Sequence, residues 1–230
     1  APPAPAEIIQ CVSWSDDEGA AHVRCWAPTG DEIELCGHGL LCCANAWLNT
    51  GSTHKSLEMN GITVRFESQQ GFSWLAFPSI EVKAVALPDW VNALLGATPE
   101  QAATAGPENG YLIVEMAADC DLAALPAPGD ALTKRSTRSL IVTRRTTGGD
   151  SLQGETIQFR YFAPQFGVPE DTATGSAMRV LASYWRYRGE GDEQKALQRS
   201  AGGGWLESRI EGEHTWIGGR VTIASTEDAA

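Results

Sequence analysis

The sequence has 230 residues, of which 43% are hydrophobic and 20% charged, a composition typical of a globular protein with its own core. Its formal net charge is -12, so its surface repels nucleic acids and anionic lipids and we expect neither as a partner. No apolar run approaches the ~20 residues that cross a bilayer. Residues 1–6, rich in Ala and Pro, lack the basic and apolar segments of a signal peptide, so we expect a cytoplasmic protein.

The cysteines argue against a metal centre and a disulfide framework. None of them forms a CxxC pair, the spacing in which zinc ligands usually occur. A chain of this length without a secretory signal seldom depends on disulfides. We therefore expect no metal and six reduced thiols: Cys11, Cys25, Cys36, Cys42, Cys43 and Cys120.

Alternating and apolar stretches predict many short strands and few helices. The expected strands are residues 22–26, 62–67, 74–77, 111–114, 139–143, 156–162 and 216–223. An almost wholly apolar run predicts a buried helix at 40–48, and a stripe at helical spacing predicts another at 177–188. A weaker helix is expected at 89–95. Strands surrounding two central helices indicate an α+β fold.

The two central helices share a preceding pattern. A strand ending in Ala-Pro leads in each case to a Gly-containing turn, at residues 35–39 in the first half and 170–176 in the second. This weak repeat at about half the chain length predicts two related lobes. We place them at residues 1–86 and 87–230.

The two turns are also candidate binding sites for an anion. Free backbone N–H groups and the helix dipole favour a carboxylate or phosphate at such a position. The predicted binding residues are Gly37, Gly39, Thr174, Gly175 and Ser176. The alternative is plain capping, with Thr172 or Thr174 as an N-cap and Gly37 as a tight-turn residue.

One titratable residue stands at each turn. His38 lies between two glycines and can act as a general acid or base near neutral pH, or can simply be packed at the turn. Asp171 stands at the corresponding point of the second half. It can take part in chemistry, or only stabilise the helix dipole.

The motifs around these turns resemble those of the phenazine-biosynthesis PhzF-like family. Residues 24–29, R-C-W-A-P-T, followed by Glu32 and the G-H of residues 37–38, are similar to the family pattern R-x-F-T-P, E and G-H. Residues 162–164, F-A-P, and 167–177, G-V-P-E-D-T-A-T-G-S-A, resemble F-A-P and G-x-x-E-D-P-A-T-G-S-A. The closing segment is similar at 198–202 and 217–219, so the resemblance runs from about residue 7 to 223.

The resemblance implies a diaminopimelate epimerase-like fold with two similar lobes, each a curved, mostly antiparallel sheet around a central helix. It implies a homodimer, and chemistry without a metal or organic cofactor. The family's namesake isomerises trans-2,3-dihydro-3-hydroxyanthranilic acid, with a glutamate near the N-terminus as proton shuttle. His38 and Asp171 match the assisting residues, and Glu7 lies at nearly the glutamate's spacing. Glu7 lacks the family's flanking serine, threonine and phenylalanine, so it could instead be an exposed terminal residue.

We therefore expect a proton-transferring isomerase or epimerase that acts on a small carboxylate-bearing metabolite, with Glu7, His38 and Asp171 as catalytic residues. One alternative is a cysteine-pair racemase of the same fold. Cys36 stands near the first turn, but residues 163–180 contain no second cysteine. Another alternative is a non-catalytic binder that has lost the base, because the family's longer N-terminal stretch with its G-N-P motif is not in this sequence.

Overall fold

The computed structural model describes residues 9–16, 20–27, 30–146, 151 and 154–221. The chain forms two compact units, one of residues 1–77 and 218–230 and the other of residues 78–217. The boundary predicted between residues 86 and 87 falls within the second unit. That the two repeated halves of the sequence meet there stays a prediction. Each unit is a sheet with one long helix against it.

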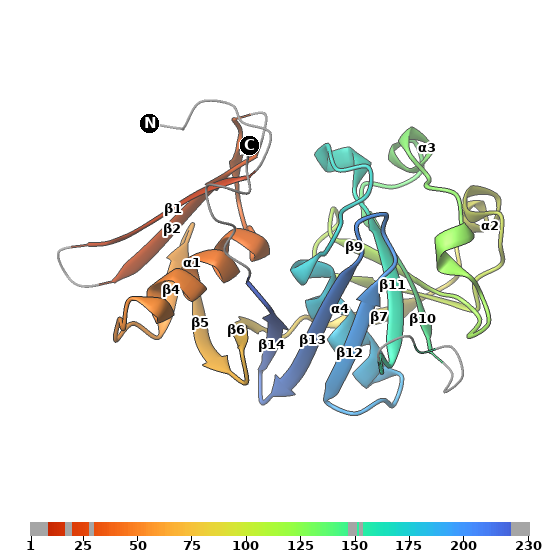
Figure 1. Ribbon diagram of the computed structural model, residues 1–230. Coiled ribbons are helices and arrows are strands. Elements are labelled where there is room, and N and C mark those ends of the chain that lie inside the picture. The colour runs from red at the N-terminus through yellow and green to blue at the C-terminus, as the bar shows by residue number, and fades with distance from the viewer. Residues whose placement is uncertain (1–8, 17–19, 28–29, 147–150, 152–153, 222–230) are drawn as a thin grey trace. The chain divides into compact units, whose positions relative to one another are not determined.

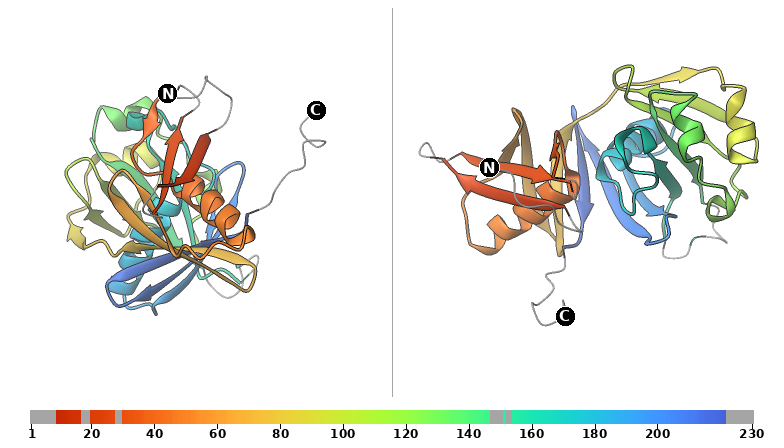
Figure 2. Two further views of the ribbon diagram at one scale, coloured as in Figure 1. Left: turned by 90° about the vertical axis from the view of Figure 1, so that its left-hand side faces the viewer. Right: turned by 90° about the horizontal axis from the view of Figure 1, so that it is seen from above.

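The first unit is a curved sheet that holds one long helix. Its elements are β1 (Gln10–Ser15), β2 (Ala21–Trp26), β3 (Glu32–Ile33), α1 (Gly37–Asn49), β4 (Ser56–Met59), β5 (Ile62–Gln69) and β6 (Phe72–Pro78). The strand order is β1-β2-β4-β5-β6, with β3 on β2; β2 and β4 are parallel, and the other pairs are antiparallel. Figures 1 and 2 show α1 against the inner face of this sheet. Leu40 and Ala44 of α1 are fully buried there.

The second unit is a larger sheet with one long helix and several short ones. Its elements are β7 (Val82–Val85), α2 (Trp90–Leu95), β8 (Gln101–Ala105), β9 (Tyr111–Glu115), η1 (Leu122–Ala124), α3 (Asp130–Thr133), β10 (Ser139–Arg145), β11 (Ile157–Phe162), η2 (Pro164–Phe166), α4 (Gly175–Tyr187), β12 (Glu193–Gln198), β13 (Gly204–Glu211) and β14 (His214–Gly219). The strands follow one another in order from β7 to β14 across the sheet. β9 pairs with β10, and β11 with β12, in parallel; β7–β8, β8–β9, β10–β11 and β12–β13 are antiparallel.

The middle strands of the second unit are covered on both faces. β11 is buried along its whole length and β10 along all but its last residue, and the polar side chains among them are therefore buried as well. On one face, Leu140 and Val142 join a core with α2, α3 and η1. On the other face, Thr143 accepts a hydrogen bond from the indole of Trp185 in α4, at 3.2 Å.

The α+β fold class is confirmed. All seven predicted strands are present, although the last ends at Gly219, before the predicted end at residue 223; residues 222 and 223 lie outside the described ranges. Both predicted central helices are present, with α1 beginning three residues before the predicted start, and the weaker helix is α2. No helix in the described part of the chain has the length and apolar character needed to cross a membrane.

Candidate functional site

The starts of α1 and α4 have nearly the same backbone geometry. Each helix has 13 residues, and each is preceded by an extended N-cap residue. Cys36 has φ -114° and ψ 101°, and Thr174 has φ -108° and ψ 100°. The repeat seen in the sequence is therefore also a repeat of local structure.

The preceding strands repeat as well, down to the contacts of two arginines. Arg24 lies over the ring of Trp26 at 5.1 Å, and Arg160 lies over the ring of Phe162 at 4.7 Å. Each arginine forms a two-pronged ion pair with a later glutamate: Glu32 in the first unit and Glu170 in the second. Both halves share the pattern Arg-x-aromatic-Ala-Pro followed by Glu, a signal that was present in the sequence but missed.

The two ion pairs differ in exposure. The side chains of Arg24 and Glu32 are 44% and 34% exposed, whereas those of Arg160 and Glu170 are 7% and 21% exposed. Arg160 also donates to the carbonyl oxygens of Leu122 and Leu125. The second pair therefore fixes the segment before α4 to the interior of its unit.

Asp171 is held at the start of α4 by its own loop. One carboxylate oxygen accepts a hydrogen bond from the backbone N–H of Thr172 at 2.8 Å, and the other accepts from the hydroxyl of Thr174 at 2.7 Å. Of the two N-cap candidates, Thr172 and Thr174, Thr174 is the N-cap residue, but its hydroxyl binds Asp171 and makes no cap hydrogen bond to the helix backbone. The orientation of the Asp171 carboxylate is fixed by these two donors.

Gln198 completes this loop from the end of β12. Its side chain is fully buried, and its carbonyl oxygen accepts from the N–H of Thr174 at 2.6 Å. Its amide group donates to the carbonyl oxygen of Asp171 at 2.6 Å and to the hydroxyl of Thr174 at 3.1 Å. Ser200 donates to the carbonyl oxygen of Thr172. The closing segment recognised in the sequence therefore holds the α4 start in place.

Two predicted binding residues present free donors at this helix start. The N–H groups of Gly175 and Ser176 lie in the first turn, where a helix supplies no acceptor, and none is found for them among the described residues. The space beside Gly175 is open, since the atom nearest to an added Cβ would be 3.9 Å away. These two groups could receive a carboxylate oxygen.

The start of α1 is built differently, because its N-cap residue is a cysteine. The sulfur of Cys36 accepts a hydrogen bond from the N–H of Gly39 at 3.3 Å, so this predicted donor is already engaged. Gly37 is the first residue of the helix. His38 follows it and is exposed, and its imidazole has no hydrogen-bond partner in the described part of the chain. His38 is thus available to a ligand.

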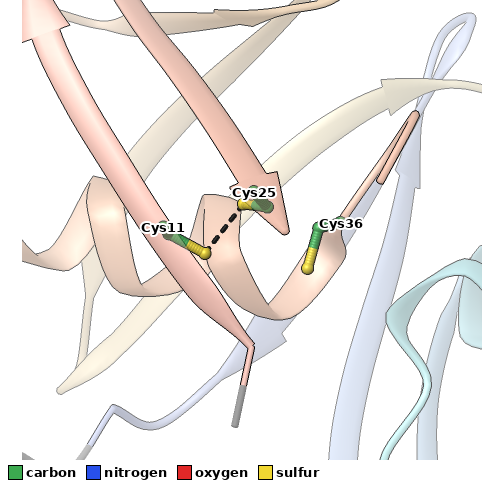
Figure 3. A group of neighbouring side chains, drawn as sticks. All are labelled: Cys11, Cys25 and Cys36. Carbon is green, nitrogen blue, oxygen red and sulfur yellow. Dashed lines mark hydrogen bonds between the residues drawn. The ribbon is translucent and has the colours of Figure 1, made fainter. Parts of the chain in front are cut away.

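Three thiols converge behind this helix start (Figure 3). The sulfur atoms of Cys11, Cys25 and Cys36 all lie within 4.8 Å of one another, and those of Cys11 and Cys25 are 2.8 Å apart. Hydrogen bonds from Cys11 and Cys25, together with the N–H of Gly39, lower the pKa of Cys36 from 9.0 to about 3. The hydrogen bond with Cys11 raises the pKa of Cys25. The cluster therefore favours one thiolate, located on Cys36.

Two of the three predicted catalytic residues lie among the described residues, one in each unit. His38 belongs to the first unit and Asp171 to the second. Glu7 lies outside the described residues. That the three converge on one ligand stays a prediction. Sequence reasoning missed Arg160, Gln198 and Ser200 as partners of the α4 start, and it missed the meeting of three cysteines.

Comparison with known proteins connects this arrangement to one family. The family model described as "Phenazine biosynthesis-like protein" matches residues 9–211. An uncharacterized isomerase of Pseudomonas aeruginosa is 30% identical over 213 residues, covering 91% of this chain and 78% of its own. A PhzF family protein of Enterococcus faecalis has the same fold, with a TM-score of 0.77 at 22% identity, covering 92% of this chain and 78% of its own.

The fold also extends to epimerases. A hydroxyproline epimerase from Agrobacterium vitis superposes with a TM-score of 0.55 at 12% identity, covering 91% of this chain and 72% of its own. At these identities the structural likeness shows the fold alone. The epimerase-like fold expected from the motifs is thereby confirmed.

Proposed function

Because the chain belongs to the phenazine biosynthesis-like PhzC-PhzF family, we propose that it is an isomerase that moves a proton on a small carboxylate-bearing metabolite. The observation that carries this proposal is the α4 start. There, the Asp171 carboxylate is oriented by Thr172 and Thr174, and the N–H groups of Gly175 and Ser176 in the same segment find no acceptor among the described residues. An acid–base group next to an anion site is what proton transfer on a carboxylate requires.

Each group has a distinct role in this proposal. Glu7 removes the proton and returns it at another carbon, and its own side chain carries the proton in between. The N–H groups of Gly175 and Ser176 bind the substrate carboxylate, with Gly37 contributing at the other helix start. His38 and Asp171 assist by donating or accepting a hydrogen bond as charge develops on the substrate. The chemistry needs no organic cofactor, and we propose a homodimer in the cytoplasm as its setting.

The test is proton exchange in heavy water. A panel of small cyclic and acyclic amino and hydroxy acids is incubated with the chain, and deuterium incorporation and isomer formation are followed by NMR. Glu7→Gln keeps the shape but cannot accept a proton at neutral pH, so exchange should fall by roughly 10²–10⁴-fold. Asp171→Asn should lose less activity than Glu7→Gln, and His38→Asn should lose the least.

A matched control separates catalysis from charge. Glu108 is an exposed carboxylate in the turn between β8 and β9, so Glu108→Gln removes one negative charge from a segment that holds none of the predicted site residues and should leave exchange unchanged. Full exchange activity in Glu7→Gln would contradict the role of Glu7. Ligand binding without exchange in the unmodified chain would instead identify a non-catalytic binder.

The lowered pKa of Cys36 favours one second candidate, in which a thiolate is the base. A two-thiol racemase still lacks its second member, because residues 163–180 contain no cysteine. The two proposals make opposite predictions. With Glu7 as the base, Cys36→Ser retains exchange and Glu7→Gln does not. With Cys36 as the base, the order is reversed.

A further inference from the structure

Three elements that are separate in the sequence bring their thiols to one point in the first unit. Cys11 lies on β1, Cys25 on β2 and Cys36 at the N-cap of α1. Cys11 and Cys25 are direct cross-strand partners, so both side chains lie on the same face of the sheet. Figure 3 shows Cys36 beside this pair. Among the described residues, these three form the one group of ligand-type side chains that lie close enough together to share a metal ion.

The three sulfur atoms pack closely against the backbone of Gly39, which has no side chain. A Cβ added at this position would lie 2.2 Å from the sulfur of Cys25, 2.4 Å from that of Cys11 and 3.3 Å from that of Cys36. All three sulfurs therefore lie directly over the Gly39 backbone, and a side chain at residue 39 would occupy their space. The Gly39 N–H also donates to the Cys36 sulfur. Backbone donors of this kind orient metal-bound ligands from the second coordination shell.

We propose that Cys11, Cys25 and Cys36 form a three-thiolate site for a soft metal ion, of the class to which Zn²⁺ and Cu⁺ belong. Thiolate ligands select such ions, whereas Mg²⁺, Ca²⁺ and Mn²⁺ prefer oxygen. Three protein ligands suit a three-coordinate ion, or a four-coordinate ion whose last position is filled by water or a small thiol. No carboxylate or imidazole of the described residues belongs to the group.

The geometry requires only a small adjustment of the side chains. Zn–S bonds of about 2.3 Å place two sulfur ligands of a tetrahedral ion roughly 3.8 Å apart. The sulfurs of Cys11 and Cys25, now 2.8 Å apart, would have to separate by about 1 Å, which small rotations about their Cα–Cβ bonds can supply. The bound ion would join the β1–β2 pair to the start of α1. It would thereby fix the turn that carries His38 without itself being a reactant.

The proposal reverses the expectation drawn from cysteine spacing. Zinc sites are usually recognised in a sequence by closely spaced pairs of cysteines or histidines. Here Cys11 and Cys25 are 14 positions apart, and Cys36 follows later in the chain, at the N-cap of α1. Cross-strand pairing replaces the short sequence spacing. The proposal does not depend on the isomerase function, because a structural ion would be bound by an inactive chain as well.

The experiment uses the full chain, reduced and freed of metal by a chelator under anaerobic conditions. It is titrated with Cd²⁺ as a spectroscopic probe, then with Zn²⁺ and Cu⁺ as competitors. We expect thiolate-to-cadmium charge-transfer absorption that saturates at one ion per chain, and native mass spectrometry should show the same ratio. Cys11→Ser, Cys25→Ser and Cys36→Ser should each weaken binding at least about ten-fold.

Two cysteines provide matched controls. Cys42 is exposed on the same helix α1, and Cys120 lies in the second unit. Cys42→Ser and Cys120→Ser should bind Cd²⁺ as the unmodified chain does. If a cluster variant fails to fold, alkylation of the unmodified chain decides instead: bound Cd²⁺ should protect Cys11, Cys25 and Cys36, and leave Cys42 reactive.

Three results would overturn the proposal. One is the absence of stoichiometric binding. Another is binding that all three cluster substitutions leave unchanged. The last is alkylation of Cys11, Cys25 and Cys36 that proceeds equally fast with and without Cd²⁺.

Discussion

The starts of α1 and α4 place the same backbone in two different chemical surroundings. Their N-cap dihedral angles differ by only a few degrees, and each is preceded by an arginine that stacks on an aromatic ring and pairs with a glutamate. The α4 start is held by oxygen and nitrogen groups, with Gln198 at its centre. The α1 start is held by sulfur. Equivalent geometry therefore does not imply equivalent chemistry.

The difference has a physical consequence for rigidity. Buried polar groups are costly unless all are hydrogen-bonded, so the network of Asp171, Thr174 and Gln198 favours one arrangement of its loop. A thiol is a weak donor and a weak acceptor, so the sulfur cluster is held mainly by packing. Thiols can also change state, by binding a metal or by oxidation. We infer that the loop at the α4 start keeps one arrangement, whereas the thiols at the α1 start can change their chemical state.

The largest expected effect separates the two ion pairs. Glu170→Ala removes the partner of a guanidinium that is 7% exposed, which leaves a buried charge unpaired, so unfolding free energy should fall by about 3 kcal/mol. Glu32→Ala breaks the equivalent pair of the first unit, whose side chains are 44% and 34% exposed. Water can replace the carboxylate there, so the unfolding free energy should fall by less than about 1 kcal/mol. Urea denaturation of both variants measures the difference. Equal losses would show that the two pairs are equivalent in energy as well as in geometry.

The next effect tests the buried network at α4. Gln198→Leu keeps much of the volume but leaves the N–H of Thr174 and the carbonyl oxygen of Asp171 without their partner, at a cost of about 2 kcal/mol. Its control is Gln101→Leu, since Gln101 is exposed on β8. Hydrogen exchange of the Thr174 amide provides a local readout. An amide that stays protected in Gln198→Leu would mean that Gln198 is not what holds the loop.

A smaller effect compares glycines at the two helix starts. Gly39→Ala forces a methyl group against the sulfurs of Cys11 and Cys25, so we expect a loss of about 1–2 kcal/mol. Gly175→Ala meets nothing closer than 3.9 Å, and alanine is the better helix former, so stability should be unchanged or rise by up to about 1 kcal/mol. Thermal unfolding of the two variants gives the comparison. A stabilised Gly39→Ala would show that the thiol cluster is loosely packed and would weaken the metal proposal.

The sequence predicted those parts of the fold that depend on local patterns. The apolar run of residues 40–48 and the helical stripe of α4 gave both central helices, and the Gly-containing turns gave their starts. Strands such as β4 and β12 were missed because each has only two apolar residues, too few to reveal an alternation. The third helix was predicted correctly but is only six residues long.

In the candidate site, too, the sequence could indicate residues in local motifs but not the partners that the fold brings to them. His38 and Asp171 could be singled out because their turns are local motifs. The partners of Asp171 could not, since Gln198 reaches it from 27 residues away. Cys11 and Cys25 meet only because β1 and β2 pair in one particular register, and a shift by one residue would turn one of them to the other face. Register is a property of the folded sheet, so the thiol cluster was not visible in cysteine spacing.

The smallest expected effect asks whether the sulfur of Cys36 is present for stability. A serine hydroxyl is a better N-cap acceptor than a thiol, so Cys36→Ser should keep the bond from the Gly39 N–H and lose only the stability that the lowered pKa of Cys36 contributes. Cys36→Ala has no acceptor and should be about 0.5–1 kcal/mol less stable than Cys36→Ser. Both are measured by urea denaturation of the reduced, metal-free chain. The expected order of stability at neutral pH is cysteine, then serine, then alanine. The difference between cysteine and serine should shrink as the pH falls, because protonation of Cys36 removes the contribution of its lowered pKa. The difference between serine and alanine measures the cap bond alone. If serine were less stable than alanine, burial of the sulfur would matter more to stability than the cap hydrogen bond, and Cys36 would be a packing residue that happens to lie beside His38.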